Sequence, residues 1–193
     1  MEIPKQQRAR GRPRAFDVQV ALDRAVEVFW KRGYVGAPLS ELTATMGITP
    51  PSLYAAFGDK RGLFLAALDR YAATAGAAPL AALRLENRPA HKLRAFLRAA
   101  VDLAYDGSHG RGCLAACVAA DAAGDDEVIR ERLGTLLRDH DAALGEATGG
   151  DAPSGRVLLG AMHAIAVRAR AGAPRGETEK LASDLLDQLE RAA

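Results

Sequence analysis

Apolar residues recur at helical spacing along most of the chain. In the first such stretch Leu22, Ala25, Val26 and Phe29 share one face, and Asp17 stands before them as an N-cap. Further stretches with this spacing, separated by glycine-containing breaks, cover residues 89–106, 113–122, 126–147, 154–171 and 177–191. Strand-like alternation and internal repeats do not occur. The pattern predicts an all-α protein with an N-terminal three-helix unit linked by a helix to a larger C-terminal helical bundle.

The segment from residue 33 to 71 indicates a short helix, a glycine turn, a second short helix and a longer third helix. Residues with capping or turn preferences mark these boundaries: Gly33, Pro38 (first turn of the second helix), Gly47, Thr49 and Asp59. This is the order of a helix-turn-helix, whose second helix is placed for the major groove of DNA.

The second short helix has a leading end suited to base edges and phosphates. Leu53 and Phe57 are expected to point inward, while short polar and apolar side chains face the groove. The predicted DNA-contacting residues are Thr49, Pro50, Pro51, Ser52, Tyr54, Ala55 and, for a phosphate, Lys60. Two short helices with a glycine turn also occur in ordinary helical bundles, so the pattern alone leaves both interpretations open.

Charge is distributed unevenly along the 193 residues. Residues 1–71 hold 11 Lys and Arg against 7 Asp and Glu, whereas the remainder holds 15 against 17. Residues 1–14 are predicted to form a flexible basic arm, in which Arg8, Arg10, Arg12 and Arg14 alternate with small or rigid residues. Such a segment suits a narrow A·T minor groove or phosphates. The alternative is a solvated patch that aids solubility.

The remaining composition narrows the class of protein. Aromatic residues make up 5% of the chain, which suits close-packed helices. No apolar run approaches the roughly 20 residues of a membrane helix, and the polar start does not follow a signal-peptide pattern. Two cysteines do not make a disulfide framework. A cytoplasmic location is therefore expected.

Residues 12–71 resemble the DNA-binding domain of TetR-family transcriptional regulators. The matching elements are Phe29-Trp30-Lys31-Arg32-Gly33-Tyr34, Met46-Gly47-Ile48-Thr49, Leu53-Tyr54, Phe57-Gly58-Asp59-Lys60 and Leu63-Phe64. The resemblance implies a DNA-binding domain at 15–75 and an effector-binding and dimerisation domain at 76–193. It further implies a homodimeric, ligand-responsive repressor that binds a pseudo-palindromic double-stranded operator.

Three positions depart from the family pattern. Ala37-Pro38 stands where a Thr-Ser pair is common, Ala56 where an aromatic residue is common, and Pro50-Pro51 where a Lys-Gly type pair is usual. Each departure removes an expected phosphate or backbone contact. The basic arm can offset the loss, because each neutralised phosphate adds affinity through counterion release.

The C-terminal part supports two expectations drawn from the family. Residues 154–171 are apolar nearly all round, and the last helix carries leucines along one stripe, so the two are expected to pair with a second copy. The predicted interface residues are Leu158, Leu181, Leu185 and Leu189. An apolar effector pocket is predicted around Phe96, Tyr105, Met162 and His163. His163 is equally well interpreted as a hydrogen-bonded core residue.

Candidate chemistry elsewhere is sparse. Cys113 and Cys117 share a helix face, which suits either a thiol switch or, as we favour, simple packing. No phosphate loop, catalytic triad motif or metal-ligand spacing is present, so neither an enzyme nor a cofactor nor a metal is expected. A helical module that binds only proteins would have no use for the basic arm.

Overall fold

The computed structural model describes residues 16–86, 88–107, 111–148 and 152–192, and all regular elements in these ranges are helical. The fold class is therefore the predicted all-α one. The helices are α1 (Val18–Gly36), α2 (Leu39–Met46), α3 (Pro50–Phe57), α4 (Lys60–Ala73), α5 (Ala78–Leu85), α6 (Pro89–Tyr105), α7 (Ala120–Ala122), α8 (Glu127–Ala147), α9 (Ala152–Arg170) and α10 (Arg175–Ala192). A 3₁₀ turn, η1 (Ala75–Ala77), precedes α5, and a π-helical turn, η2 (Ala115–Ala119), precedes α7.

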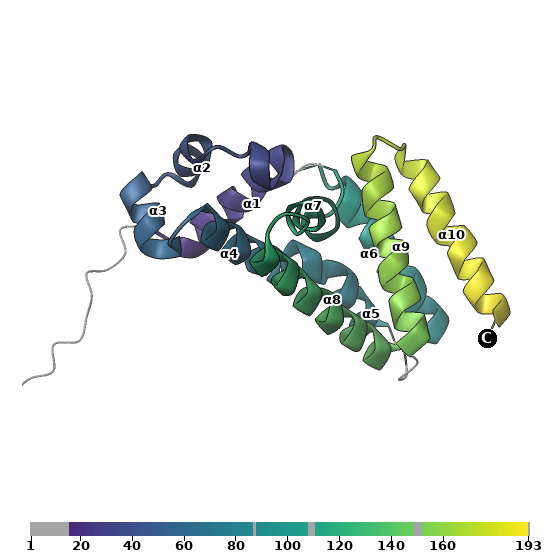
Figure 1. Cartoon of the computed structure of the whole chain (residues 1–193). Coiled ribbons are helices and arrows are strands. Elements are labelled where there is room, and N and C mark those ends of the chain that lie inside the picture. Colours follow the sequence, from purple (N-terminus) through teal and green to yellow (C-terminus); the bar gives the residue numbers. More distant parts are fainter. Residues whose placement is uncertain (1–15, 87, 108–110, 149–151, 193) are drawn as a thin grey trace, which may run out of the picture.

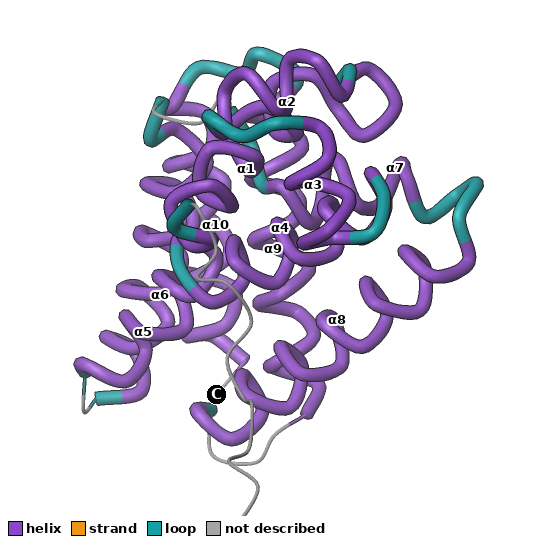
Figure 2. The backbone as a smooth tube through the Cα atoms, turned by 90° about the vertical axis from the view of Figure 1, so that its left-hand side faces the viewer, coloured by secondary structure: helices purple, strands orange, loops and turns teal. Residues whose placement is uncertain are grey.

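Helices α1 to α4 form one end of the molecule, and α9 and α10 run side by side at the other (Figure 1). The long helix α8 extends from the neighbourhood of α4 towards the far end of α9. Figure 2 traces the backbone and shows that short loops join the helices in the part of the chain that the structure describes. No helix in the described ranges is long and apolar enough to cross a membrane.

Local chemistry sets the helix boundaries as expected. The carboxylate of Asp17 accepts from the backbone of Gln19 and Val20, and Asp59 caps α4 by accepting from Gly62 at 2.7 Å. Gly33 leaves the helical conformation at φ 76°, although α1 resumes for a further turn to Gly36. Pro38 differs slightly from the prediction. It is the residue before α2 rather than part of its first turn.

Helix α5 was not predicted. The sequence pattern loosens around Ala75–Pro79, and we placed the end of the first unit there and the next helix at residue 89. In the structure the chain forms η1 and then α5, with Pro79 in the first turn, where its missing N–H costs no hydrogen bond. Leu83 of α5 is fully buried, so this short helix contributes to the core.

The interior contains two apolar cores. The first packs the aromatic residues of α1 and α4 edge to face: Phe29 lies 5.0 Å from Phe64, and Trp30 lies 5.1 Å from Tyr71, between ring centroids. It continues beyond α4 into η2 and α8, with Leu114 and Ile129 fully buried. The second core joins α5, α6, α9 and α10 with the end of α8. The first core therefore connects the helix-turn-helix to η2 and α8.

Candidate DNA-binding surface and internal cavity

Helix α3 begins with a side-chain cap and two prolines. The backbone N–H of Ser52 donates to Thr49 Oγ1 at 3.4 Å, and the two hydroxyl oxygens lie 3.0 Å apart. Pro50 and Pro51 occupy the first turn, where an α-helix has no internal acceptors for N–H groups. The cap and the two prolines therefore start the helix, and the capping Thr49 side chain is itself exposed.

The side chains of α3 divide between core and solvent as predicted. Leu53 is fully buried, and Phe57 packs against the first core. Tyr54 is 49% exposed. Exposed residues around it are Thr49, Pro50, Pro51 and Ala55, and Ser52 is half-buried. The predicted reading residues thus lie on the solvent-facing side and leading end of one short helix.

Tight turns hold α3 against its neighbours. Gly47 adopts the left-handed conformation at φ 70°, and its N–H donates to carbonyls at the end of α2. Arg24 of α1 reaches the carbonyl of Met46 at 3.5 Å. After α3, the N–H of Gly58 donates to the Tyr54 carbonyl at 2.9 Å. Helices α1, α2 and α4 together therefore set the direction of α3.

Gly62, in the first turn of α4, is a positioning residue that sequence reasoning missed. A Cβ at this position would lie 2.0 Å from the carbonyl oxygen of Phe57, the last residue of α3. No side chain fits there while α3 and α4 keep this approach. Its backbone has ordinary helical dihedral angles, without the positive φ that favours glycine. The sequence therefore gives no sign that this position requires glycine.

Lys60 lies close to the end of α1. Its Nζ donates to the carbonyl of Val35 at 3.2 Å and lies 5.2 Å from the centre of the Tyr34 ring. Burial lowers the pKa of this ammonium. Contact between Lys60 and a phosphate stays a prediction. Residues Arg8, Arg10, Arg12 and Arg14 of the arm lie outside the described residues.

Several polar contacts connect α1 and α4 to the C-terminal part. The Trp30 Nε1–H donates to the Arg111 carbonyl at 3.4 Å, and Arg170 Nη1 donates to the Trp30 carbonyl at 2.7 Å. Arg132 of α8 pairs with Asp69 of α4 at 2.6 Å. Although each contact is modest alone, together they tie the helix-turn-helix to α8 and α9.

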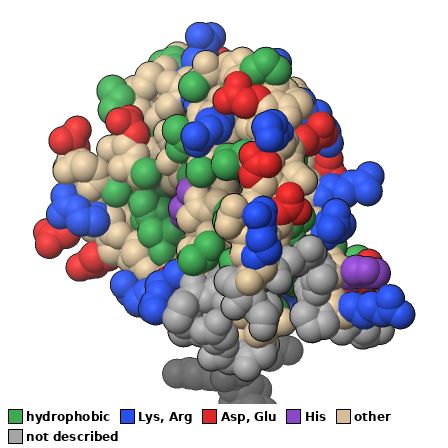
Figure 3. All heavy atoms as spheres, turned by 90° about the vertical axis from the view of Figure 1, so that its right-hand side faces the viewer, with side chains coloured by type: hydrophobic (Ala, Val, Ile, Leu, Met, Phe, Trp, Pro, Cys, Tyr) green, Lys and Arg blue, Asp and Glu red, His purple; other side chains and the backbone are tan. Residues whose placement is uncertain are grey.

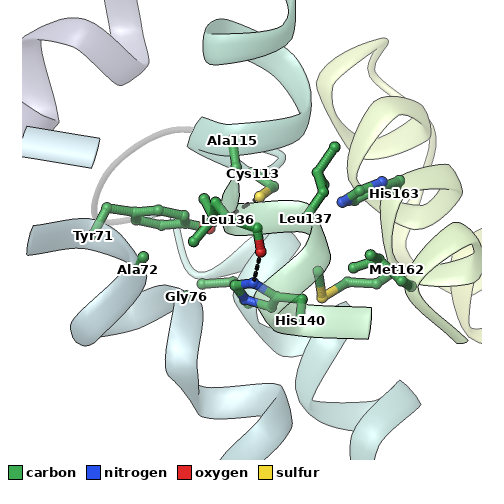
Figure 4. Close-up of a pocket in the computed structure, with 12 residues that line it drawn as sticks. Tyr71, Ala72, Gly76, Cys113, Ala115, Leu136, Leu137, His140, Met162 and His163 are labelled. Atoms are coloured by element: carbon green, nitrogen blue, oxygen red, sulfur yellow. Dashed lines mark hydrogen bonds between the residues drawn. The ribbon is translucent and has the colours of Figure 1, made fainter. Parts of the chain in front are cut away.

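An internal cavity lies directly behind α4. Its walls come from α4, η1, α6, α8 and α9 and the start of η2 (Figure 4). The lining residues are Tyr71, Ala72, Gly76, Leu103, Cys113, Ala115, Leu136, Leu137, His140, Leu159, Met162 and His163. Its free volume is about 20 Å³, room for about one water molecule. In this conformation the cavity is almost filled by side chains.

The cavity has few polar groups, and each is either hydrogen-bonded to another residue or buried. The Tyr71 hydroxyl donates to Cys113 Sγ at 3.2 Å, and burial raises the pKa of both groups. His140 Nδ1 lies 2.7 Å from the Leu136 carbonyl (Figure 4). Burial, and secondarily the neighbouring His140, lower the pKa of His163. The cavity is thus an apolar space with few polar groups at its edges.

The structure separates the four predicted pocket residues. Met162 and His163 line the cavity, but Phe96 and Tyr105 do not. Phe96 is 1% exposed and lies in the second core. The Tyr105 hydroxyl instead donates to the Ala173 carbonyl at 2.8 Å, between α6 and the α9–α10 loop. Sequence reasoning missed Tyr71, Leu136 and His140, which reach the cavity from helices distant in the chain.

Cys113 lies just before η2, and Cys117 lies within it. Cys113 is buried in the first core and Cys117 packs partly against it, the arrangement expected of small apolar residues. The elevated pKa of Cys113 keeps its thiol protonated at neutral pH. Within the described residues no cluster of three or more His, Cys, Asp or Glu side chains is arranged to hold a metal.

The predicted interface residues pack mainly against other residues of the same chain. Leu158 is fully buried, while Leu181, Leu185 and Leu189 are partly buried and pack against the second core. The exposed apolar residues of α9 are instead Val157, 46% exposed, and Val167, 53% exposed. Figure 3 shows the end of the molecule that carries α10, where mixed charged side chains lie beside a gathering of apolar ones.

The capped helix α3, with its exposed leading end, has the form expected of a DNA-contacting helix, and comparison with known proteins identifies the family. The profile of "Bacterial regulatory proteins, tetR family" matches residues 21–67. The chain is 44% identical over 89 residues to the HTH-type transcriptional repressor BdcR of Escherichia coli, and 48% identical over 64 residues to the repressor ComR of the same organism. These matches span 45% and 30% of those relatives.

A solved structure matches nearly the whole chain. A cysteine mutant of the TetR family transcriptional regulator CifR, complexed with 26-bp double-strand operator DNA, is 31% identical with a TM-score of 0.82, covering 91% of this chain and 98% of that one. The chain therefore belongs to the TetR family. It is a DNA-binding transcriptional regulator, not an enzyme.

Proposed function

We propose that the protein is a ligand-responsive repressor that binds a pseudo-palindromic operator as a homodimer. The exposed leading end of α3, which follows the Gly47 turn after α2 and packs Leu53 into the first core, carries this proposal. Thr49, Pro50, Pro51, Ser52, Tyr54 and Ala55 read bases, and Lys60 meets a phosphate. Support comes from BdcR and ComR, both named repressors, and from CifR, which was solved on operator DNA.

The proposal assigns a different role to each of three consecutive segments of the chain. Residues 1–14 form a basic arm whose four arginines add minor-groove or phosphate contacts, residues 15–75 form the DNA-binding domain, and residues 76–193 bind the effector and dimerise. The first core contains residues from both sides of residue 75. This supports tight coupling between the DNA-binding domain and the effector-binding and dimerisation domain. The protein acts in the cytoplasm, where the DNA is.

The cavity behind α4 is the proposed effector site. Its apolar walls and few polar groups favour a neutral or weakly anionic hydrophobic ligand, since no carboxylate lines it. Ligand sites usually enclose about 300–1,000 Å³, so the cavity must open to admit one. Opening displaces Tyr71 or Ala72 at the end of α4, the helix that supports α3, or Gly76 in η1 just after it. The ligand then favours a conformation that does not fit the operator.

A thermal-shift screen tests the effector proposal. Lipophilic neutral or weakly acidic compounds are expected to raise the midpoint of unfolding and to release operator DNA in the same concentration range. Met162→Trp, which fills the cavity, is expected to abolish the shift. Val128→Trp, at an exposed position of α8 away from the cavity, is the matched control. Uniformly cationic hits, or hits unaffected by Met162→Trp, would contradict the proposed site.

The exposed face of α9 is the proposed core of the dimer interface. Val157 and Val167 present apolar side chains to solvent in one chain, and the small residues Gly160 and Ala164 lie between them at helical spacing. A two-fold axis would bring two copies of this face together, with α10 beside it. Leu181, Leu185 and Leu189 then act by supporting α10 from the second core.

Replacing Val167 by Asp tests this interface. Because Val167 is already exposed in one chain, the change leaves the fold of a monomer intact but buries two unpaired carboxylates in a dimer. Sedimentation velocity is expected to show a folded monomer with strongly reduced operator affinity. Val128→Asp, a comparably exposed valine on α8, is expected to remain dimeric. A dimeric Val167→Asp variant would place the interface elsewhere.

A further inference from the structure

The last regular turn of α1 receives a hydrogen bond from α9. Helix α1 is interrupted at Gly33, which adopts φ 76° and ψ 172°. Carbonyl groups in the turn before a helix end lack helical N–H partners and need others. The carbonyl of Trp30 lies in that turn and accepts from Arg170 Nη1 at 2.7 Å. Arg170, 140 positions later in the chain, therefore caps the end of α1.

The chemistry of this contact favours a strong, directional link. A hydrogen bond from a charged donor is stronger than one between neutral groups, and a positive charge is favourable at the C-terminal end of a helix. Trp30 is 1% exposed and belongs to the first core, so the position of its carbonyl is fixed by packing. Arg170 is an exposed residue. Replacing it therefore removes the link to α1 without opening a hole in the core.

The segment that precedes η2 completes a three-way junction with α1 and α9. The Arg111 carbonyl accepts from Trp30 Nε1 at 3.4 Å and lies 3.5 Å from Arg170 Nη1. The next residue, Gly112, has φ 97°, and a Cβ there would lie 3.0 Å from the Ala166 carbonyl oxygen and 3.2 Å from Arg170 Cβ. The backbone at residues 111–112 therefore packs directly against α9 beside Arg170.

Helix α9 packs mainly into the second core. Of its described residues, Leu158, Ile165 and Ala169 belong to that core, whereas the first core includes Ala166. An alanine methyl group supplies a small, non-directional contact. The hydrogen bond from Arg170 adds the directional constraint on α1 that this contact cannot supply.

Arg170 also lies close to the proposed dimer interface. Val167, an exposed apolar residue of that interface, precedes it by three positions, so the two side chains are neighbours on the surface of α9. The same turn of α9 therefore joins the proposed contact between protomers to the end of α1.

We propose that Arg170 is a positioning residue that sets the spacing at which the two α3 helices of a dimer meet DNA. This inference rests on the proposed dimeric binding to a pseudo-palindrome. Dimers of helix-turn-helix proteins bind half-sites about 34–36 Å apart, so the separation of their recognition helices must match the DNA. Helix α3 moves with α1, because Leu53 and the apolar face of α1 share the first core. Arg170 fixes the direction of α1 relative to the helix that carries the interface.

Fluorescence anisotropy on duplexes with different half-site spacing tests the proposal. The probes are a labelled operator duplex from the protein's own upstream region and the same duplex with one or two base pairs inserted between its half-sites. The wild type is expected to bind the lengthened duplexes about tenfold or more weakly, and Arg170→Met about threefold or less weakly, because its two DNA-binding units can adjust. A residue that only stabilised the fold would change all three affinities alike and leave their ratio intact.

Two further variants make the result specific to the capping bond. Arg170→Lys keeps the charge and a donor for the Trp30 carbonyl, and is expected to bring the affinity ratio back towards that of the wild type. Arg84→Met removes an exposed arginine of α5 and is expected to leave the ratio unchanged. Circular dichroism and sedimentation velocity are expected to show a folded dimer for each variant.

An affinity ratio in Arg170→Met equal to that of the wild type would overturn the proposal. So would a ratio in Arg170→Lys no closer to the wild type than that of Arg170→Met, because the donor to Trp30 would then be irrelevant. A monomeric Arg170→Met would assign Arg170 to the dimer contact itself. Failure of the proposed function gives a different result: the wild type would itself bind all three duplexes equally well.

Discussion

Replacing Gly62 by Ala is expected to disrupt the recognition helix more than any other single-methyl change. The added Cβ would lie 2.0 Å from the Phe57 carbonyl oxygen, so the end of α3 and the start of α4 must separate. The Cβ is fixed to the α4 backbone, and the oxygen belongs to the α3 backbone. The clash therefore cannot be relieved by moving a flexible side chain. Overpacking of this kind costs about 1–3 kcal/mol of stability, and the shifted α3 is expected to bind operator at least about tenfold more weakly.

Gly145→Ala is the matched control for this variant. Gly145 lies within α8, and a Cβ there meets no atom within 4 Å. Replacing a helical glycine by alanine at an unhindered position is expected to leave stability unchanged or raise it by up to about 1 kcal/mol. Thermal unfolding and fluorescence anisotropy on labelled operator measure both effects. Operator affinity in Gly62→Ala equal to that of the wild type would show that the α3–α4 approach is not needed for DNA binding.

Replacing Tyr54 by Ala is expected to weaken operator binding about tenfold or more while preserving the fold. Tyr54 is 49% exposed at the centre of the solvent-facing side of α3, so its ring and hydroxyl are available to DNA. Tyrosine is enriched among the few central interface residues whose truncation costs about 2 kcal/mol or more. Fluorescence anisotropy gives the affinity, and circular dichroism with thermal unfolding reports the fold.

Two further substitutions make the Tyr54 experiment specific. Tyr54→Phe separates the hydroxyl from the ring, and Val128→Ala, at a comparably exposed position on α8, is expected to leave operator binding unchanged. If Tyr54→Ala binds operator as tightly as the wild type, α3 does not read DNA through this face. A loss of helical signal in parallel with a loss of affinity would instead make Tyr54 a structural residue.

The helix-turn-helix could be predicted from the sequence because short-range chemistry determines it. Asp17, Thr49 and Asp59 cap the helices that follow them, Gly47 supplies the left-handed turn, and Leu53 has an apolar side chain that the core requires. Each of these features depends on residues a few positions apart. The exposed side of α3, which is predicted to contact DNA, could be predicted for the same reason.

Features that depend on tertiary packing could not be predicted in the same way. The close approach at Gly62 appears only when α3 and α4 are in place, and the cavity is formed by Tyr71, His140 and Met162 from three separate helices. The pattern loosens around Ala75–Pro79 and predicts no helix at 78–85, although Pro79 in a first turn allows α5 to form. Which leucines of α9 and α10 face inward also depends on the neighbouring helices.

The central claim is that the protein binds one operator sequence through α3. The most direct measurement is fluorescence anisotropy of the full chain on a labelled duplex from its own upstream region and on a scrambled duplex of equal length, at several salt concentrations. Binding to the upstream duplex is expected to be tighter by about a thousandfold or more, with affinity falling steeply as salt rises. Equal affinity for the two duplexes across these conditions would contradict it.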